Sequence, residues 1–501
     1  MAGGIFSKKP YQLFMKEMES DNRLRRILGP VSLTSLGVGS TIGTGIFVLI
    51  GLAIHDKAGP ALIVSFAAAG VACVFAALSY AELASMVPVA GSTYTYAYAT
   101  MGELFAWIIG WDLVLEYAVA ASTVANGWSQ YFLSLLSVFG LTLPESITKA
   151  PFDYDPVIGK IIATGTVMDL PALLVTAALT LLLVKGIKES AGFNNLMVGI
   201  KLTVIVMVIV LGAFYINPAN WHPFAPYGWA GISFFGKTIW GQTGAGGEPL
   251  GMMAGAAIVF FSYIGFESVS THAEEARNPK RDVPIGLIAS LLICTAVYLG
   301  VAVVLTGMVP TTRINVNAPV AEAFKSVGLN WAHFVVSIAA LAGITSVLLV
   351  TILSQARILL AIARDGLLPQ KFFGEVHPKF RTPWKATIAT GIFVGIPAAF
   401  VPLRILAELV SIGTLFAFVI VCVAVVIMRV RHPEAERPFK CPFMPVFPIV
   451  GAVFCLVLMF SLPAENWLRL FIWLAIGFVI YFGYGRRHSR LNHPRPDNGA
   501  K

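Results

Sequence analysis

Charge is scarce in this chain. Only 12% of its 501 residues are charged, roughly half the share typical of soluble domains, whereas 57% are apolar. A soluble core of this size cannot bury that much apolar surface, but a bilayer accepts it in runs of about 20 residues. The five cysteines show no CxxC spacing, so neither a disulfide, a metal site nor another cofactor is expected. The composition therefore excludes an ordinary soluble protein and predicts a membrane protein.

Long apolar runs occupy most of the chain, and about twelve can be counted. The third and eighth, of about 33–36 residues, must tilt or extend beyond the hydrocarbon. We therefore expect an all-α polytopic membrane protein with about 12 transmembrane helices. The runs lie at 31–54, 60–87, 103–138, 170–186, 192–216, 251–271, 284–309, 331–363, 384–402, 405–428, 446–463 and 467–484.

The distribution of Lys and Arg predicts the orientation. If the N-terminus lies inside and the runs alternate, the inside segments hold roughly three times as many Lys and Arg as the outside loops. Both termini are then expected in the cytoplasm, with 1–30 and 485–501 as tails of a single transmembrane domain at 31–484. The net charge of +9 thus reflects topology in the cell membrane, and no nucleic acid partner is expected.

The first apolar run contains a glycine-rich stretch at 37–47, GVGSTIGTGIF. Each glycine weakens a helix by about 1 kcal/mol relative to alanine, and a broken helix within a membrane is tolerated where it lines a cavity. The helix resumes near Gly43, so its free N–H groups and positive dipole end suit a carboxylate. Close helix packing through small residues is the alternative explanation.

A second interruption lies in the sixth run at 260–267, FFSYIGFE. The two interrupted runs are five helices apart, an odd number, so the second unit has the opposite orientation. Interrupted helices at matching places in inverted halves indicate a transport site near the bilayer midplane. The pair of breaks therefore favours a carrier over packing alone.

Four segments carry a resemblance to a known family. They are 37–47, 260–267, the loop EEARNPKRDVPIG at 274–286, and RDGLLP at 364–369. Together they resemble the amino acid–polyamine–organocation superfamily, and most closely its bacterial cationic amino acid transporter branch. The similarity covers nearly the whole chain.

The resemblance implies a fold and a mechanism. The fold is a five-plus-five inverted-repeat (leucine-transporter-like) core with two extra helices. Repeat one is expected at about 31–216, repeat two at about 251–428, and the extra helices at about 446–484. The mechanism is alternating access, driven by the proton gradient or by exchange.

The resemblance also implies a substrate site built largely from main chain. Amides of Gly43, Thr44 and Gly45 would bind a substrate carboxylate. Carbonyls near Thr41, and those of Phe261, Ser262 and Ile264, would bind its ammonium group. The Phe261 ring would close over the ligand. Such contacts recognise what all α-amino acids share and do not select a side chain. The expected substrate-binding residues are Thr41, Gly43, Thr44, Gly45, Phe261, Ser262, Ile264 and Thr351.

Charged residues inside apolar runs are functional hypotheses by default, because they are costly in a membrane. The resemblance puts a lysine at Lys201 where sodium-driven relatives hold a sodium ion, so Lys201 is expected to couple transport to protons. A lysine that snorkels to the interface is the alternative. Glu116 is a second proton-coupling candidate, and a structural hydrogen bond across helices is the alternative. Asp112 and Glu82 are weaker candidates, and Glu267 is a candidate cap or gate.

The eighth run supplies the expected side-chain pocket. Thr351 stands where bacterial members of the branch can carry a bulkier apolar residue, so we expect it to widen the pocket for larger, including cationic, substrates. Ordinary helix packing with a back-bonded hydroxyl is the alternative. Arg357, near the end of this run, is a candidate inner gate or a snorkelling side chain.

Other classes of protein fit the sequence less well. The histidines lie mainly in loops, and no HExxH or GxSxG motif falls on a helix, so an enzyme is not expected. The sequence shows neither the continuous charged stripe expected of a channel nor the added soluble domain that is the usual sign of a nutrient sensor. An exchanger and a polyamine transporter stay open as alternatives. The expected partners are an amino acid substrate, protons and the lipid bilayer, with the oligomeric state left open.

Overall fold

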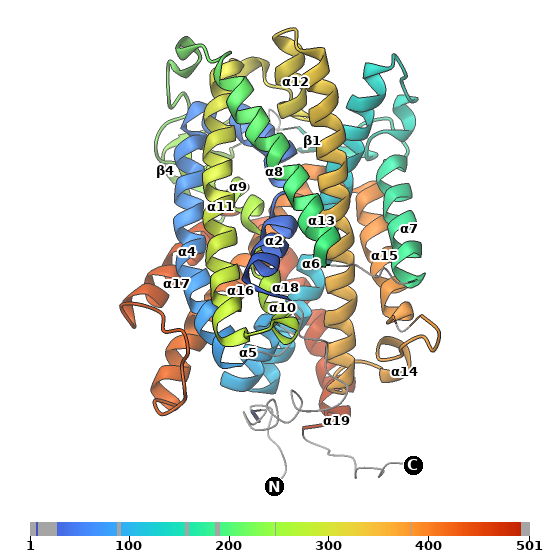
Figure 1. The fold of residues 1–501 in the computed structure, drawn as a ribbon, viewed down its shortest axis with the longest axis vertical. Coiled ribbons are helices and arrows are strands. Elements are labelled where there is room, and N and C mark those ends of the chain that lie inside the picture. The colour runs from blue at the N-terminus through green and yellow to red at the C-terminus, as the bar shows by residue number, and fades with distance from the viewer. Residues whose placement is uncertain are drawn as a thin grey trace.

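The structure of this chain is a computed structural model, which describes residues 7–8, 28–87, 92–155, 160–185, 191–245, 247–380 and 382–491. Most of the expected tails at 1–30 and 485–501 lie outside these residues. The described part is a bundle of long helices that run mostly along one direction (Figure 1).

Helices account for most of the described residues, in agreement with the apolar runs. In chain order they are α2 (Pro30–Thr41), η1 (Gly45–Leu49), α3 (Ile50–Ala53), η2 (Ile54–Ala58), α4 (Leu62–Met86), α5 (Ser92–Thr100), α6 (Glu103–Val138), α7 (Leu170–Lys185), α8 (Ala191–Ala213), α9 (Met252–Val259), η6 (Phe260–Tyr263), α10 (Ser268–Thr271), η7 (Ala273–Glu275), α11 (Pro279–Met308), α12 (Pro319–Ser326), α13 (Asn330–Arg364), α14 (Gln370–Phe373), α15 (Trp384–Phe400), α16 (Leu403–Arg431), α17 (Val446–Ser461), α18 (Ala464–Ile480) and α19 (Arg486–His488).

The two largest expected outside loops contain short strands, so the prediction of a purely helical chain needs a small correction. Each strand has two to four residues and pairs in an antiparallel hairpin within its loop. The pairs are β1 (Phe152–Asp155) with β2 (Lys160–Ala163), β3 (Ile232–Phe234) with β4 (Lys237–Trp240), and β5 (Gln242–Thr243) with β6 (Pro249–Leu250).

Eight helical stretches of the described chain are long and apolar enough to cross a bilayer, and α7, α15 and α17 are shorter apolar helices. One of the eight is continuous from Gly45 to Met86. The long third and eighth helices are found as α6 and α13, with 36 and 35 residues. The count of about twelve crossings stays a prediction.

Apolar side chains cover the outside of this bundle. Large apolar residues on four helices are more than half exposed: Leu181 on α7, Val206 and Val210 on α8, Ile392 on α15 and Val479 on α18. Many exposed apolar side chains of this kind are unsuited to water and fit contact with lipid. The polar and broken segments lie inside.

Three pairs of helices that are five apart in the order of apolar runs pack against each other. The pairs are α4 with α11, α6 with α13, and α7 with α15, and the short segments η1 and η6 also touch. Figure 1 shows α2, α9 and α10 in the middle of the bundle, and α2 packs on α8, α11 and α13. The core of the bundle therefore surrounds the two broken helices.

Candidate functional site

The first broken helix opens between α2 and η1. The glycine-rich stretch ends α2 at Thr41, and Ile42 takes an extended conformation with ψ of 100°. The chain returns to helical geometry at Thr44. Within the described chain, the main-chain amides of Gly43, Thr44 and Gly45 donate no hydrogen bond. They are the free first-turn donors of a new helix, where the positive end of its dipole lies.

The second broken helix opens after η6. Ile264 is extended, with ψ of 132°, and Gly265 has φ of +119°, a region that L side chains rarely adopt. A Cβ on Gly265 would lie 2.6 Å from the carbonyl oxygen of Ser40, so only glycine fits. The Glu267 carboxylate accepts the Gly265 amide at 2.9 and 3.2 Å. The Glu267 side chain makes no capping hydrogen bond to α10, so its role as a cap or gate stays a prediction.

The two breaks contact each other directly. A Cβ on Gly45 would lie 2.5 Å from the Cα of Ser262. The Ser40 hydroxyl lies 2.9 Å from the Gly265 carbonyl oxygen and 2.7 Å from the Ser268 hydroxyl. These contacts join the first broken helix to both sides of the second, so a shift of either half-helix changes the other.

The Tyr298 hydroxyl on α11 bridges the same two breaks. It lies 2.6 Å from the Ser262 carbonyl oxygen and 3.1 Å from the Thr41 carbonyl oxygen, and it donates to both. Tyr298 is fully buried. Two of the carbonyls expected to bind a substrate ammonium group therefore already accept a hydrogen bond from Tyr298.

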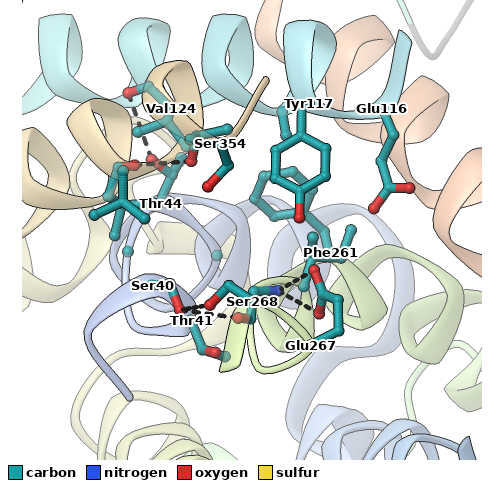
Figure 2. Close-up of a pocket in the computed structure, with 18 residues that line it drawn as sticks. Ser40, Thr41, Thr44, Glu116, Tyr117, Val124, Phe261, Glu267, Ser268 and Ser354 are labelled. Atoms are coloured by element: carbon teal, nitrogen blue, oxygen red, sulfur yellow. Dashed lines mark hydrogen bonds between the residues drawn. The ribbon is translucent and has the colours of Figure 1, made fainter. Parts of the chain in front are cut away.

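A small cavity of about 40 Å³ lies between the breaks, α6 and α13 (Figure 2). Its walls combine main chain with apolar and polar side chains. They are formed by Ser40, Thr41, Gly43, Thr44, Gly45, Glu116, Tyr117, Ala120, Val124, Phe261, Ile264, Gly265, Glu267, Ser268, Val347, Val350, Thr351 and Ser354.

Two carboxyl groups face this cavity. Figure 2 shows Glu116 and Tyr117 reaching from α6 towards Phe261 and Glu267. Glu116 is 3% exposed; one of its oxygens accepts the Thr414 hydroxyl at 2.7 Å, and the other has no partner in the described chain. Unlike a purely structural carboxyl, Glu116 keeps one oxygen available to a ligand.

Asp112 lies one helical turn before Glu116 and is fully buried. Neither of its carboxyl oxygens has a hydrogen-bond partner among the described residues. From the sequence, Asp112 was a weaker candidate than Glu116. It is, however, the tenth residue of α6 and faces Gly413 on α16. A Cβ added to Gly413 would lie 3.2 Å from Oδ1 of Asp112.

Most residues assigned to the site from sequence line the cavity together. Thr41, Gly43, Thr44, Gly45, Phe261, Ile264, Thr351 and Glu116 do so. Ser262 needs a correction: it is fully buried behind the cavity, because its side chain packs against Gly45 and its carbonyl accepts Tyr298. The Thr351 hydroxyl donates back to Val347 at 2.8 Å, so its methyl group is what the cavity can use.

Lys201 lies behind the first break and not in the cavity. Its ammonium group donates to the carbonyls of Gly39 at 2.8 Å and Ile42 at 3.3 Å, on the two sides of the end of α2. On α13, a Cβ added to Gly343 would lie 3.1 Å from Lys201 Cε. Lys201 therefore joins α8 to α2 and α13, and at 3% exposure it does not snorkel.

Four polar residues of the cavity were not assigned to it from the sequence: Ser40, Tyr117, Ser268 and Ser354. Ser354 could have been found, because it follows Thr351 by three residues and so shares its helix face. Tyr117 follows Glu116 directly and has no such periodic signal. Ser268 reaches the cavity only through the sharp turn at Gly265.

Arg357 lies at the end of the bundle that carries α5 and α19. Its guanidinium is 3.3 Å from Nε2 of His272 and 3.9 Å from the Glu275 carboxylate. Burial, with the nearby guanidinium adding to it, lowers the pKa of His272 to about 4. The neutral ring donates through Nδ1 to the Ser268 carbonyl at 2.9 Å and accepts Arg357 at Nε2. Arg357 thus links α13 to the segment after the second break.

Comparison with known proteins decides the family. Residues 28–483 match the amino acid permease family. The chain belongs to this family. The match spans nearly the whole chain and confirms the resemblance to the amino acid–polyamine–organocation superfamily. With its apolar helices, this permease is a multi-pass membrane protein, and nothing points to a catalytic activity.

Alignments with named relatives span almost the full length of both sequences. It is 44% identical to the methylthioribose transporter of Bacillus subtilis (strain 168), over 97% of this chain and 99% of the relative. It is 45% identical to the branched-chain amino acid permease BcaP of the same organism, over 98% and 100%. The vacuolar cationic amino acid transporter 4 of Arabidopsis thaliana is 32% identical, over 95% and 94%.

Proposed function

We propose that this permease carries α-amino acids across the cell membrane by alternating access. One observation carries the proposal: the amides of Gly43, Thr44 and Gly45 donate no hydrogen bond within the described chain, and these residues line the cavity at the start of a half-helix. Buried donors without acceptors are costly, and a substrate carboxylate satisfies them at the positive end of the helix dipole. A ligand without an anionic group leaves these donors unmet.

The substrate ammonium group binds on the opposite side of the cavity, at the second break. The carbonyls of Thr41 and Ser262 already accept the Tyr298 hydroxyl. The Ile264 carbonyl accepts no hydrogen bond within the described chain, and Ile264 lines the cavity. Ile264 is therefore the preferred acceptor, with the Phe261 ring beside it as a gate.

The cavity favours neutral apolar side chains. Ala120, Val124, Val347 and Val350 form an apolar wall, and Thr351 presents no free hydroxyl hydrogen there. Branched aliphatic substrates match this wall by shape and by the hydrophobic effect. The relative named for branched-chain amino acids agrees with this preference.

A second substrate class rests on a separate observation. Glu116 and Glu267 both line the cavity, and one Glu116 oxygen is unpaired among the described residues. A cationic side chain that reaches them gains a charge-assisted hydrogen bond. The relative named as a cationic amino acid transporter supports including lysine and arginine among the candidates.

Proton coupling is assigned to Lys201 and Glu116. Lys201 holds the carbonyls at the end of α2 through its ammonium group, and loss of a proton removes part of that hold. Loss of this proton affects both the first break and α13, since Lys201 contacts both. Exchange without proton coupling is the alternative. Lys201→Gln is expected to keep counterflow but to lose accumulation driven by a pH gradient; full accumulation would refute the role.

The architecture proposed with this function is the five-plus-five inverted repeat. The packing of α4 on α11, α6 on α13 and α7 on α15 supports repeats at about 31–216 and 251–428, with extra helices at 446–484. Both termini would lie in the cytoplasm.

Uptake into liposomes that contain the purified protein tests substrate and coupling together. The panel holds alanine, valine, leucine, lysine, arginine, spermidine and methylthioribose, each with and without an inward pH gradient. We expect valine and leucine to accumulate and the gradient to increase their uptake. Binding without counterflow would indicate a sensor. Uptake of spermidine or methylthioribose with no amino acid transport would refute the carboxylate assignment, because neither carries a carboxylate.

A further inference from the structure

A groove runs along the outward face of α11 near its N-terminus. The segment around Phe439 forms its other wall. Lys280 and Arg281 lie at one end of the groove, and Ile285, Ile288 and Leu292 continue along it. The groove is separate from the substrate cavity, with which it shares no residue.

The spacing of these residues makes a single stripe on the helix. Arg281, Ile285, Ile288 and Leu292 are separated by four, three and four positions, which places them on one face of α11. The stripe extends about 16 Å along the helix axis from Arg281 to Leu292. That length is about half the hydrocarbon thickness of a bilayer, or one leaflet. The stripe therefore has the dimensions of one acyl chain below its headgroup.

The stripe is open to its surroundings. Leu292 is 55% exposed and Ile285 39% exposed. The opposite face of α11 is closed, since its Gly286 and Ser290 pack against Leu33 and Gly37 of α2. In a membrane-spanning bundle, the medium that covers the exposed face is lipid.

The charged end of the groove has spare positive charge. Lys280 pairs with Glu436 at 3.0 Å, but both side chains are more than half exposed, so this pair contributes little stability. Arg281 makes no ion pair with any residue in the described ranges. An arginine with a free guanidinium at a membrane interface binds phosphate oxygens well, since its donors match their geometry.

We propose that this groove binds one anionic phospholipid, with the headgroup phosphate on Lys280 and Arg281. An acyl chain lies along Ile285, Ile288 and Leu292 and against Phe439. The positive charge favours an anionic headgroup over a zwitterionic one, whose own ammonium group opposes both side chains. The proposal rests on the membrane-spanning bundle and not on the choice of transport substrate.

Lipid retention measures the site directly. The purified protein is placed in nanodiscs that contain phosphatidylcholine with a minor fraction of phosphatidylglycerol, and bound lipids are counted by native mass spectrometry. We expect one phosphatidylglycerol to be retained per chain. Arg281→Gln should weaken its retention about fivefold, and Lys280→Gln/Arg281→Gln about 25-fold, because each interfacial cation is worth about 1 kcal/mol. Lys371→Gln removes a cation on α14, outside the groove, and should change nothing.

Two further arms separate the apolar stripe from the charge and the lipid from a soluble anion. Ile288→Asn should reduce retention although both cations remain. Inorganic phosphate at tens of millimolar should leave retention unchanged; displacement of the lipid would overturn the proposal in favour of a simple anion site. Equal retention of phosphatidylcholine, or an unaffected double variant, would also overturn it. Each variant must elute as wild type in gel filtration and keep its substrate uptake, which shows that it is folded.

Discussion

Gly45 is the tightest contact between the two broken helices, and replacing it with alanine tests the site as a unit. The added Cβ would lie 2.5 Å from the Ser262 Cα, whereas carbon atoms at rest are separated by about 3.5–4.0 Å. The shortfall is about 1 Å. Because the atom in the way belongs to the backbone, no rotamer change relieves it, and η1 and η6 must move apart.

We expect Gly45→Ala to cost about 1–3 kcal/mol of stability, the usual penalty for overpacking. The loss of uptake should be larger than this cost suggests, because the same shift moves the free amides at Gly43 and Thr44 relative to the second break. Affinity for a carboxylate depends on their placement to within about 0.5 Å. Uptake should therefore fall at least tenfold.

The matched control is Gly199→Ala on α8, where an added Cβ meets nothing within 4 Å. It removes a helical glycine, so stability should hold or rise slightly. Both variants are compared by thermal unfolding in detergent and by amino acid uptake in liposomes. If Gly45→Ala unfolds at the wild-type temperature and transports at the wild-type rate, the two breaks are not in the close contact described here.

Three other substitutions test separate parts of the molecule. Tyr298→Phe removes a hydroxyl that bridges both breaks at 2.6 and 3.1 Å. It should lower the free energy of unfolding by about 1–3 kcal/mol and raise the KM for uptake. Its control, Tyr263→Phe, loses a hydrogen bond to α4 away from the cavity and should leave the KM unchanged. Thr351→Met fills part of the cavity and should lower leucine uptake relative to alanine uptake; an unchanged ratio contradicts the assignment. Glu82→Gln should lower the free energy of unfolding by about 3–5 kcal/mol and so lower the unfolding temperature. The buried carboxylate accepts hydrogen bonds from Arg429 and the Cys441 amide and also forms an ion pair with Arg437. Its control, Glu145→Gln in an exposed pair, should unfold like the wild type.

The sequence located both helix breaks because their cause is local. Glycine at 37–45 and at Gly265 weakens helices wherever it stands, and the structure interrupts the helices at 42–43 and 264–267. The free amides at the first break follow from that interruption alone. For the same reason, the apolar runs predicted the positions of the long helices well.

Contacts across helices were beyond local reasoning. Nothing in the spacing of Tyr298 indicates that its hydroxyl would reach Thr41 and Ser262, more than thirty positions away in each case. That contact lies behind the cavity, and it is the reason that the proposed function prefers the Ile264 carbonyl as acceptor for the ammonium group. Asp112 was underrated for a similar reason, since its burial depends on how α16 packs on α6.

The sequence by itself determined that this chain is a membrane protein with two broken helices and a buried lysine. Composition and glycine content act residue by residue, so no knowledge of packing is needed to read them. Only the tertiary structure decided which polar groups are free and which are satisfied. Lys201 and Tyr298 each donate hydrogen bonds to carbonyls that a broken helix exposes. The amides at 43–45 and one Glu116 oxygen, in contrast, have no hydrogen-bond partner among the described residues. Hydrogen bonding is short-ranged and directional, so it is fixed only when the helices meet.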